Sequence, residues 1–134
     1  MVWTHFLLAV FAAGAACSLT DWFFGGILFH GKYLAYPEVW RQGPGKSEAS
    51  AVTWSVLLGF VTCACFPFVC VAFHVGGYAK TFELAALCWL MIPVPLLVTN
   101  ALFIKLHPLV VVSHLLGWLA KLCVAALAAV LSLA

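Results

Sequence analysis

The sequence predicts an all-α fold, a four-transmembrane-helix antiparallel bundle with one long interfacial loop between helices 1 and 2. Hydrophobic residues make up 66% of the chain and charged residues only 7%, whereas an ordinary soluble domain carries about a quarter charged residues. The mean hydropathy is +1.17. Because so few charges cannot cover a water-exposed surface, we expect residues 1–134 to form a single domain inside a lipid bilayer.

Four apolar runs supply the predicted spans, and they cover residues 3–29, 51–73, 82–104 and 109–133. Each run can cross a hydrocarbon core of about 30 Å at ~1.5 Å per residue. Helices are predicted because barrel strands alternate in polarity over about 10 residues, and these runs do not. The first run lacks a basic start and is too long for a signal peptide, so we expect a permanent helix. Pro93 and Pro95 predict a kink in the third.

The long first loop, HGKYLAYPEVWRQGPGKSEAS, holds most of the charge. Tyr33, Tyr36 and Trp40 are amphipathic rings of the kind that lie at the headgroup level. YPEVWR predicts one turn of helix on the membrane surface, with Pro37 at its first position. We favour an interfacial anchor over a lid that covers a cytoplasmic opening.

The basic residues predict the orientation. The first and third loops share one side of the membrane and carry Lys32, Arg41, Lys46 and Lys105, whereas the other side carries Lys80 alone. The positive-inside rule places these two loops in the cytoplasm and both termini outside. The net charge of +2 is too small to predict a nucleic-acid partner.

Four polar groups interrupt the predicted spans. At ~1.5 Å per residue, Asp21 lies about 14 Å, His114 about 10 Å and Asn100 about 7 Å below the cytoplasmic interface. Lys121 lies deeper, two helical turns from His114 and on the same face. A lone charge in lipid costs about 2.5–3.5 kcal/mol on insertion scales. We therefore predict that Asp21 faces the interior and contacts Lys121, His114 or Asn100, in either a packing pair or a functional site.

The six cysteines all fall inside apolar runs. CAC at Cys63 to Cys65 is not the C-x-x-C of a redox protein, so we expect small buried hydrophobes and no stable disulfide. His5, His74, Tyr78 and Glu83 cluster at the opposite membrane face, where solvated helix ends explain them better than a metal site. No nucleotide, haem, zinc or Ser-nucleophile motif is present, and no cofactor is predicted.

The segments DWFFGGILFHGKYLAYPEVWR, LLVTNALF and HLLGWLAKLCVAALAAVL give the chain a family resemblance. It resembles small bacterial four-helix integral membrane proteins grouped as a domain-of-unknown-function family. The resemblance implies a four-helix membrane fold and a bacterial inner-membrane location, and it implies no activity. More distantly, the architecture is similar to anthrone-oxygenase-like membrane proteins, whose buried Asn, His and Trp correspond to Asn100, His114 and Trp118.

Three hypotheses for function follow. In the first, a cytoplasm-facing intramembrane pocket binds or moves a small apolar or amphiphilic ligand, in a monomer or a homo-oligomer, and it is lined by Asp21, Asn100, His114, Trp118 and Lys121. In the second, the protein is a membrane oxidoreductase or oxygenase that uses His114 as a base. In the third, it is a structural accessory subunit whose polar layer only fixes packing. A pocket of about 300 Å³ or more at the Asp21 layer would favour the first two.

Overall fold

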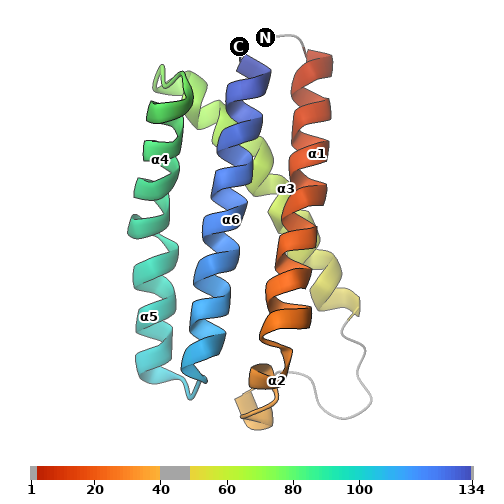
Figure 1. The fold of residues 1–134 in the computed structure, drawn as a ribbon, viewed down its shortest axis with the longest axis vertical. Coiled ribbons are helices and arrows are strands. Elements are labelled where there is room, and N and C mark those ends of the chain that lie inside the picture. The colour runs from red at the N-terminus through yellow and green to blue at the C-terminus, as the bar shows by residue number, and fades with distance from the viewer. Residues whose placement is uncertain (1–2, 40–48, 134) are drawn as a thin grey trace.

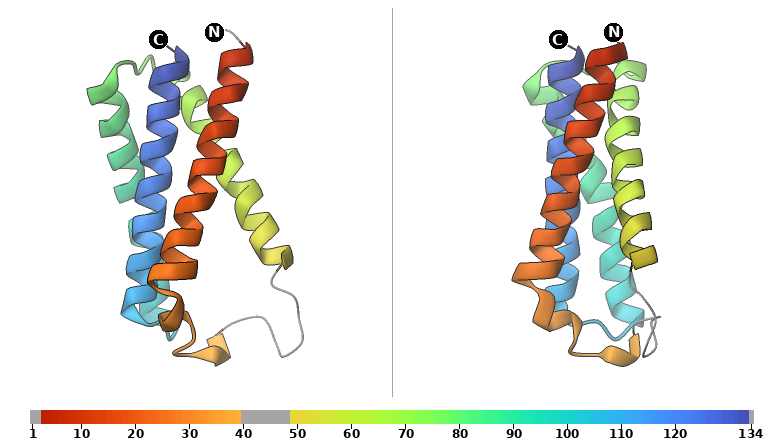
Figure 2. Two further views of the ribbon diagram at one scale, coloured as in Figure 1. Left: turned by 45° about the vertical axis from the view of Figure 1, so that its right-hand side comes forward. Right: turned by 90° about the vertical axis from the view of Figure 1, so that its right-hand side faces the viewer.

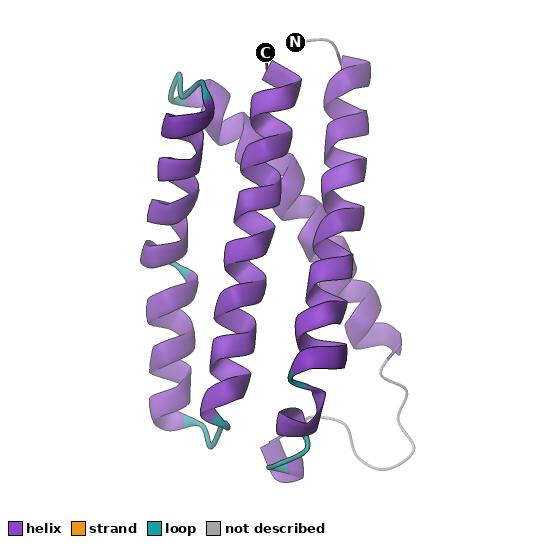
Figure 3. Cartoon of the chain, viewed as in Figure 1, coloured by secondary structure: helices purple, strands orange, loops and turns teal. Residues whose placement is uncertain are grey.

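The computed structural model describes residues 3–39 and 49–133. Four helical stretches in this part are long and apolar enough to span a membrane: Trp3–Leu28, Ala49–Ala72, Tyr78–Phe103 and Pro108–Ser132. The described chain contains no strand (Figure 3). The predicted all-α fold with four membrane spans is thereby confirmed. Trp40, Arg41 and Lys46, which the sequence analysis assigned to the interfacial loop, lie outside the described residues.

The first span begins as a regular α-helix, α1 (Trp3–Asp21), and continues as a π-helix, η1 (Trp22–Leu28). The short α2 (His30–Tyr33) and the 3₁₀ turn η2 (Pro37–Val39) follow it. The turn at Pro37 confirms the short helix expected in YPEVWR. The wider π-helical turn was not expected, and it follows Asp21 directly, with Gly25 and Gly26 in its middle. Such turns are frequent at functional sites.

The remaining spans follow the predicted runs closely. They are α3 (Ala49–Ala72), the pair α4 (Tyr78–Met91) and α5 (Pro93–Phe103), and α6 (Pro108–Leu133). The third span is interrupted at Ile92, directly before Pro93, which confirms the predicted kink. The third span also begins one turn earlier than predicted, at Tyr78, and the Gly77 carbonyl accepts hydrogen bonds from both the backbone N–H and the hydroxyl of Thr81 in this first turn.

Helix α6 is the centre of the fold, and α1, α3, α4 and α5 all pack against it. Figures 1 and 2 show both ends of the described chain at one end of the molecule, which we call the termini end. The helix α2 and the connection between α5 and α6 lie at the opposite end, which we call the loop end (Figure 1). The four spans are therefore antiparallel to their chain neighbours, as predicted.

The core of the bundle is built mainly from small side chains, with the larger Phe66 and Leu122 among them. Ala125, Ala126 and Ala129 of α6 are buried against Cys17 of α1 and Cys63 of α3. Small residues let helix backbones approach closely, which drives helix association in lipid more than hydrophobicity does. Large apolar side chains point outward along every span, as expected where lipid rather than water surrounds the protein.

Helix α3 packs along only part of its length. Every residue from Ala49 to Leu58 is exposed except the half-buried Val56, and the first buried residue of the helix is Gly59. Figure 2 shows α3 diverging from α1 toward the loop end. Residues 50–58 of α3 are thus mostly exposed, and Gly59 marks the position where α3 leaves the bundle.

Candidate functional site: an ion pair where α3 leaves the bundle

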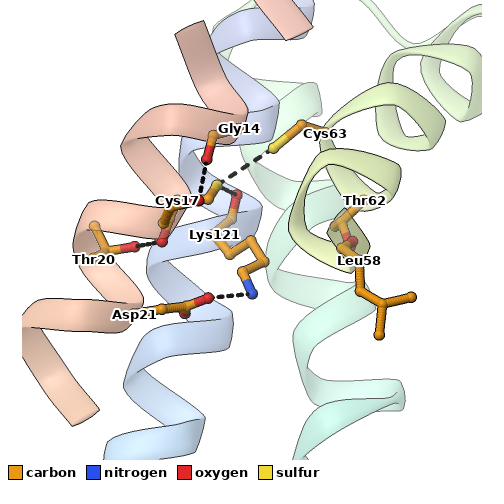
Figure 4. A network of polar contacts seen from close by, with 9 residues as sticks. Gly14, Cys17, Thr20, Asp21, Leu58, Thr62, Cys63 and Lys121 are labelled. Carbon is orange, nitrogen blue, oxygen red and sulfur yellow. Dashed lines mark hydrogen bonds and ion pairs between the residues drawn. The ribbon is translucent and has the colours of Figure 1, made fainter. Parts of the chain in front are cut away.

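Asp21 and Lys121 form an ion pair inside the predicted membrane region. The Lys121 Nζ donates to Asp21 Oδ2 at 2.8 Å, and the two residues lie 100 positions apart in the chain. Figure 4 shows the pair between α1 and α6, on the side that faces α3. The prediction that the Asp21 carboxylate contacts a polar residue of another helix is confirmed, with Lys121 as the partner.

Two glycines make room for the pair. A Cβ on Gly59 of α3 would lie 3.9 Å from both Cε and Nζ of Lys121, and a Cβ on Gly117 of α6 would lie 3.4 Å from Asp21 Oδ1. These are ordinary van der Waals distances, so an alanine would fit at either position, whereas longer side chains would compete with the lysine or the carboxylate for space. Three helices, α1, α3 and α6, therefore surround the pair.

The two charges differ in how much they are covered. The side chain of Lys121 is 9% exposed, whereas that of Asp21 is 33% exposed. Asp21 Oδ1 accepts no hydrogen bond from any described residue, since only Oδ2 is bonded. The Lys121 Nζ also lies 4.9 Å from the centre of the Trp118 ring, a cation–π distance. The site thus offers a free carboxylate oxygen beside a covered ammonium and an exposed indole ring.

His114 belongs to a separate group nearer the loop end. Its Nε2 lies 3.3 Å from the Tyr33 hydroxyl, and that hydroxyl donates to Ser113 at 3.1 Å. Burial raises the pKa of the Tyr33 phenol, the hydrogen bond to Ser113 acts in the opposite direction, and the charge of Asp21 raises it further. The group attaches the segment after the first span to α6, and no hydrogen bond joins His114 to Asp21 in the described part of the chain.

Asn100 is not brought to the ion pair. It lies on α5, which packs on α4 and α6, while Asp21 ends α1 on another side of α6. Figure 1 shows α6 between these two helices. The expectation that Asn100 could donate to Asp21 is therefore not met, because depth in the membrane predicts the level of a residue but not the side of the bundle on which it lies.

A second pairing, which was not predicted from the sequence, lies above the ion pair. Cys17 Sγ and Cys63 Sγ lie 3.4 Å apart, and the Cys17 thiol also lies 3.7 Å from the Lys121 carbonyl oxygen (Figure 4). Cys17 precedes Asp21 by one helical turn, so a position on the same face of α1 was the available signal. All six cysteines are free thiols in the structure.

Two cavities in the described part of the structure lie away from the ion pair. One, of about 240 Å³, is at the termini end between the α3–α4 turn and α6, and a much smaller one lies at the loop end beside Tyr36 and Lys105. Neither is lined by Asp21 or Lys121. Within residues 3–39 and 49–133, no group of three or more His, Cys, Asp or Glu side chains could hold a metal ion.

Comparison with known proteins identified no relative of the chain. No protein-family model, curated protein or solved structure matches the chain. The resemblance to bacterial four-helix membrane proteins therefore stays a prediction based on the quoted segments. The fold and the site together define an integral membrane helical bundle with a partly open internal ion pair.

Proposed function

We propose that the protein binds a small amphiphilic ligand at the Asp21–Lys121 ion pair. The observation that carries this proposal is the uneven covering of the pair, in which the buried ammonium is paired and one carboxylate oxygen has no described partner. Ionisable residues inside membrane spans are costly and commonly mark ligand or ion sites. A pair that served packing alone would be expected to be covered on both sides.

The chemistry of the site fits a polar headgroup that both donates and accepts hydrogen bonds. Asp21 Oδ1 would accept from a hydroxyl, amide or ammonium donor of the ligand. Lys121 carries three donors, of which one is used on Asp21 Oδ2, and another could serve a ligand carbonyl or hydroxyl oxygen. The exposed Trp118 ring beside the lysine would cover the apolar part of such a ligand.

The divergence of α3 supports access from the side of the bundle. Lys121 lies against Gly59, where α3 leaves the other helices, and the preceding part of α3 is exposed. A ligand dissolved in the bilayer could therefore approach the pair laterally, with its tail along apolar residues such as Leu57 and Leu58. The two cavities described above do not reach Asp21, so the proposal rests on this lateral access and not on the pocket of about 300 Å³ that the sequence led us to expect at the Asp21 layer.

The alternative functions differ in what they require. A packing-only role needs the pair but no ligand, and it predicts that an uncharged, well-packed replacement works equally well. An oxidoreductase role needs His114 at a substrate site, yet His114 is bonded to Tyr33 instead of the ion pair. We therefore keep the packing role as the competing hypothesis that the experiment must separate.

The test is native mass spectrometry of the full chain purified from its membrane in a mild detergent. We expect the wild-type protein to retain a discrete amphiphile and the Asp21→Asn/Lys121→Met double variant to fold but lose it. The matched control is Glu38→Gln/Lys105→Gln, which removes the exposed ion pair of the loop end and should keep the bound species. The same spectra give the number of protein copies.

Two outcomes would contradict the proposal. One is a wild-type spectrum that holds only the bulk lipids of the membrane in proportion to their abundance. The other is a double variant that retains the discrete amphiphile as well as the wild type does. Either result would favour the packing-only role for Asp21 and Lys121.

We also propose a bacterial inner-membrane location with both termini outside. The described loop end carries Lys32 and Lys105, and the termini end carries Lys80, so the asymmetry supports a cytoplasmic loop end. A reporter that is active only outside the cytoplasm, fused after the C-terminus, should be active. Activity of a cytoplasm-only reporter at the same position would reverse the orientation.

A further inference from the structure

We propose that Cys17 and Cys63 form a redox site, in which a lipid-soluble quinone oxidises the two thiols to a reversible disulfide between α1 and α3. The inference is independent of ligand binding at the ion pair. It also departs from the expectation, drawn from the absence of a C-x-x-C motif, that the cysteines serve as small hydrophobes.

The contact between the two sulfur atoms carries the inference. The Sγ atoms lie 3.4 Å apart and both side chains are fully buried. A disulfide bond is about 2.05 Å long, so the sulfurs need to approach by little more than ~1 Å, which side-chain rotation and a small helix shift can supply. Among the described residues, no other two cysteines have their sulfur atoms in hydrogen-bonding contact, and Cys65, two residues from Cys63, is exposed.

The location of the pair selects the class of oxidant. Both thiols lie in the middle parts of apolar spans, one on α1 and one on α3, where water-soluble oxidants are scarce. A quinone dissolves in the hydrocarbon core and accepts two electrons and two protons. The step is balanced: the two S–H bonds break, one S–S bond forms, and the two hydrogens reduce the quinone to its hydroquinone.

The divergence of α3 gives the oxidant a route. Cys63 lies one helical turn from Gly59, the position at which α3 leaves the bundle. A small further opening of α3 would expose the thiols, and buried thiols react only when such an opening occurs. The reaction is therefore expected to be slow in the closed bundle.

A disulfide here would fasten α1 to α3 beside the ion pair. Cys17 precedes Asp21 by one turn on α1, and its thiol already contacts the Lys121 carbonyl. The bond would join two residues that lie 46 positions apart in the chain and thereby restrict the unfolded chain. Oxidation should consequently make the full-length protein more resistant to unfolding by a denaturing detergent.

The experiment treats the full chain in lipid nanodiscs with a short-tailed, fully ring-substituted benzoquinone, which cannot easily add a thiol to its ring. The protein is then unfolded with a maleimide present, and its intact mass and peptides are measured. We expect two fewer maleimide labels, a loss of the mass of two hydrogen atoms, and a Cys17–Cys63 linked peptide that a reductant removes.

Matched variants make the result specific. Cys17→Ser and Cys63→Ser should each abolish the linked peptide, and Cys65→Ser should leave it unchanged because that thiol is exposed and points elsewhere. Diamide, a small thiol oxidant, serves as the check on geometry. Failure of both oxidants to link the two residues in folded protein would overturn the site, and linkage by diamide without linkage by the quinone would overturn the quinone as its oxidant.

Discussion

The part of the chain that the structure describes contains two Lys–carboxylate ion pairs in opposite surroundings. Lys121 and Asp21 meet at 2.8 Å inside the bundle, with side chains 9% and 33% exposed. Lys105 and Glu38 meet at 3.3 Å at the loop end, with side chains 66% and 59% exposed. The inner pair joins α1 to α6, and the outer pair joins the turn η2 to the connection between α5 and α6.

The two pairs differ most in their surroundings, and the surroundings set how much an ion pair contributes to stability. Water screens the outer pair, and such exposed pairs contribute little to stability. The inner pair lies where each separated charge would be penalised by about 2.5–3.5 kcal/mol on insertion scales. We therefore expect a large effect when the inner pair is broken and a small one when the outer pair is broken, and the following changes test this contrast.

The largest effect should come from Lys121→Met. This change leaves the Asp21 carboxylate inside the span without its cation, and removal of one partner of a buried pair costs about 3–5 kcal/mol. Because Asp21 is a third exposed, we expect a value at the lower end of that range. Reversible unfolding in mixed micelles of mild and denaturing detergent measures the difference.

The control for this change is the double variant Asp21→Asn/Lys121→Met. It removes both charges and should recover most of the lost stability, since no unpaired ion remains. A double variant whose loss equals the sum of the two single losses would show that the two side chains act independently and that the contrast with the outer pair is wrong.

Gly14→Ala should have the next largest effect, because it disturbs the α1–α3 interface beside the inner pair. A Cβ at this position would overlap the Phe60 ring of α3 more closely than real Cβ atoms approach other atoms. Overpacking of this kind costs about 1–3 kcal/mol. The matched control is Gly31→Ala, where nothing lies within 4 Å of the added carbon, and equal stability of both variants would refute the tight packing of α1 on α3.

A smaller effect on stability is expected from Tyr33→Phe. Tyr33 lies between the two ion pairs along the bundle. The change removes the hydroxyl that donates to Ser113 and lies next to His114. One such hydrogen bond contributes about 0.5–1.5 kcal/mol. The same unfolding assay should show a loss in that range, with Tyr78→Phe at the termini end as the control, and no measurable loss would mean that this contact does not hold the loop end to α6.

Much of the fold followed from the sequence because a bilayer imposes strong rules on length and polarity. Apolar length predicted the four spans, and Pro93 predicted the interruption of the third. The cost of a buried charge predicted that Asp21 would find a partner, and Lys121 was among the residues at suitable depth.

The rest depended on how each helix is rotated and tilted, which hydropathy does not encode. Asn100 was at a suitable depth but on another side of α6, and Cys17 met Cys63 across helices that lie far apart in sequence. The divergence of α3 before Gly59 also had no signal in a uniformly apolar run. The depth of a residue in the membrane follows from its own helix, whereas a contact between two residues depends on how both helices are placed.

The smallest effect concerns the outer pair and its dependence on pH. The hydrogen bond from its own backbone N–H lowers the pKa of the Glu38 carboxyl, slight burial opposes this, and the hydrogen bond and charge of Lys105 lower it further. A lowered pKa in the folded state means that the stabilisation is present above the ordinary pKa of the carboxyl and is lost as the pH falls through the folded value. Carbon NMR of the Glu38 side chain should show this lowered pKa, and Lys105→Gln should move it back only in part, because the largest cause remains. A full return of the Glu38 pKa to its ordinary value would contradict this and make Lys105 the main cause. The free energy of unfolding should change too little on Glu38→Gln to be resolved, in contrast to the loss expected from Lys121→Met.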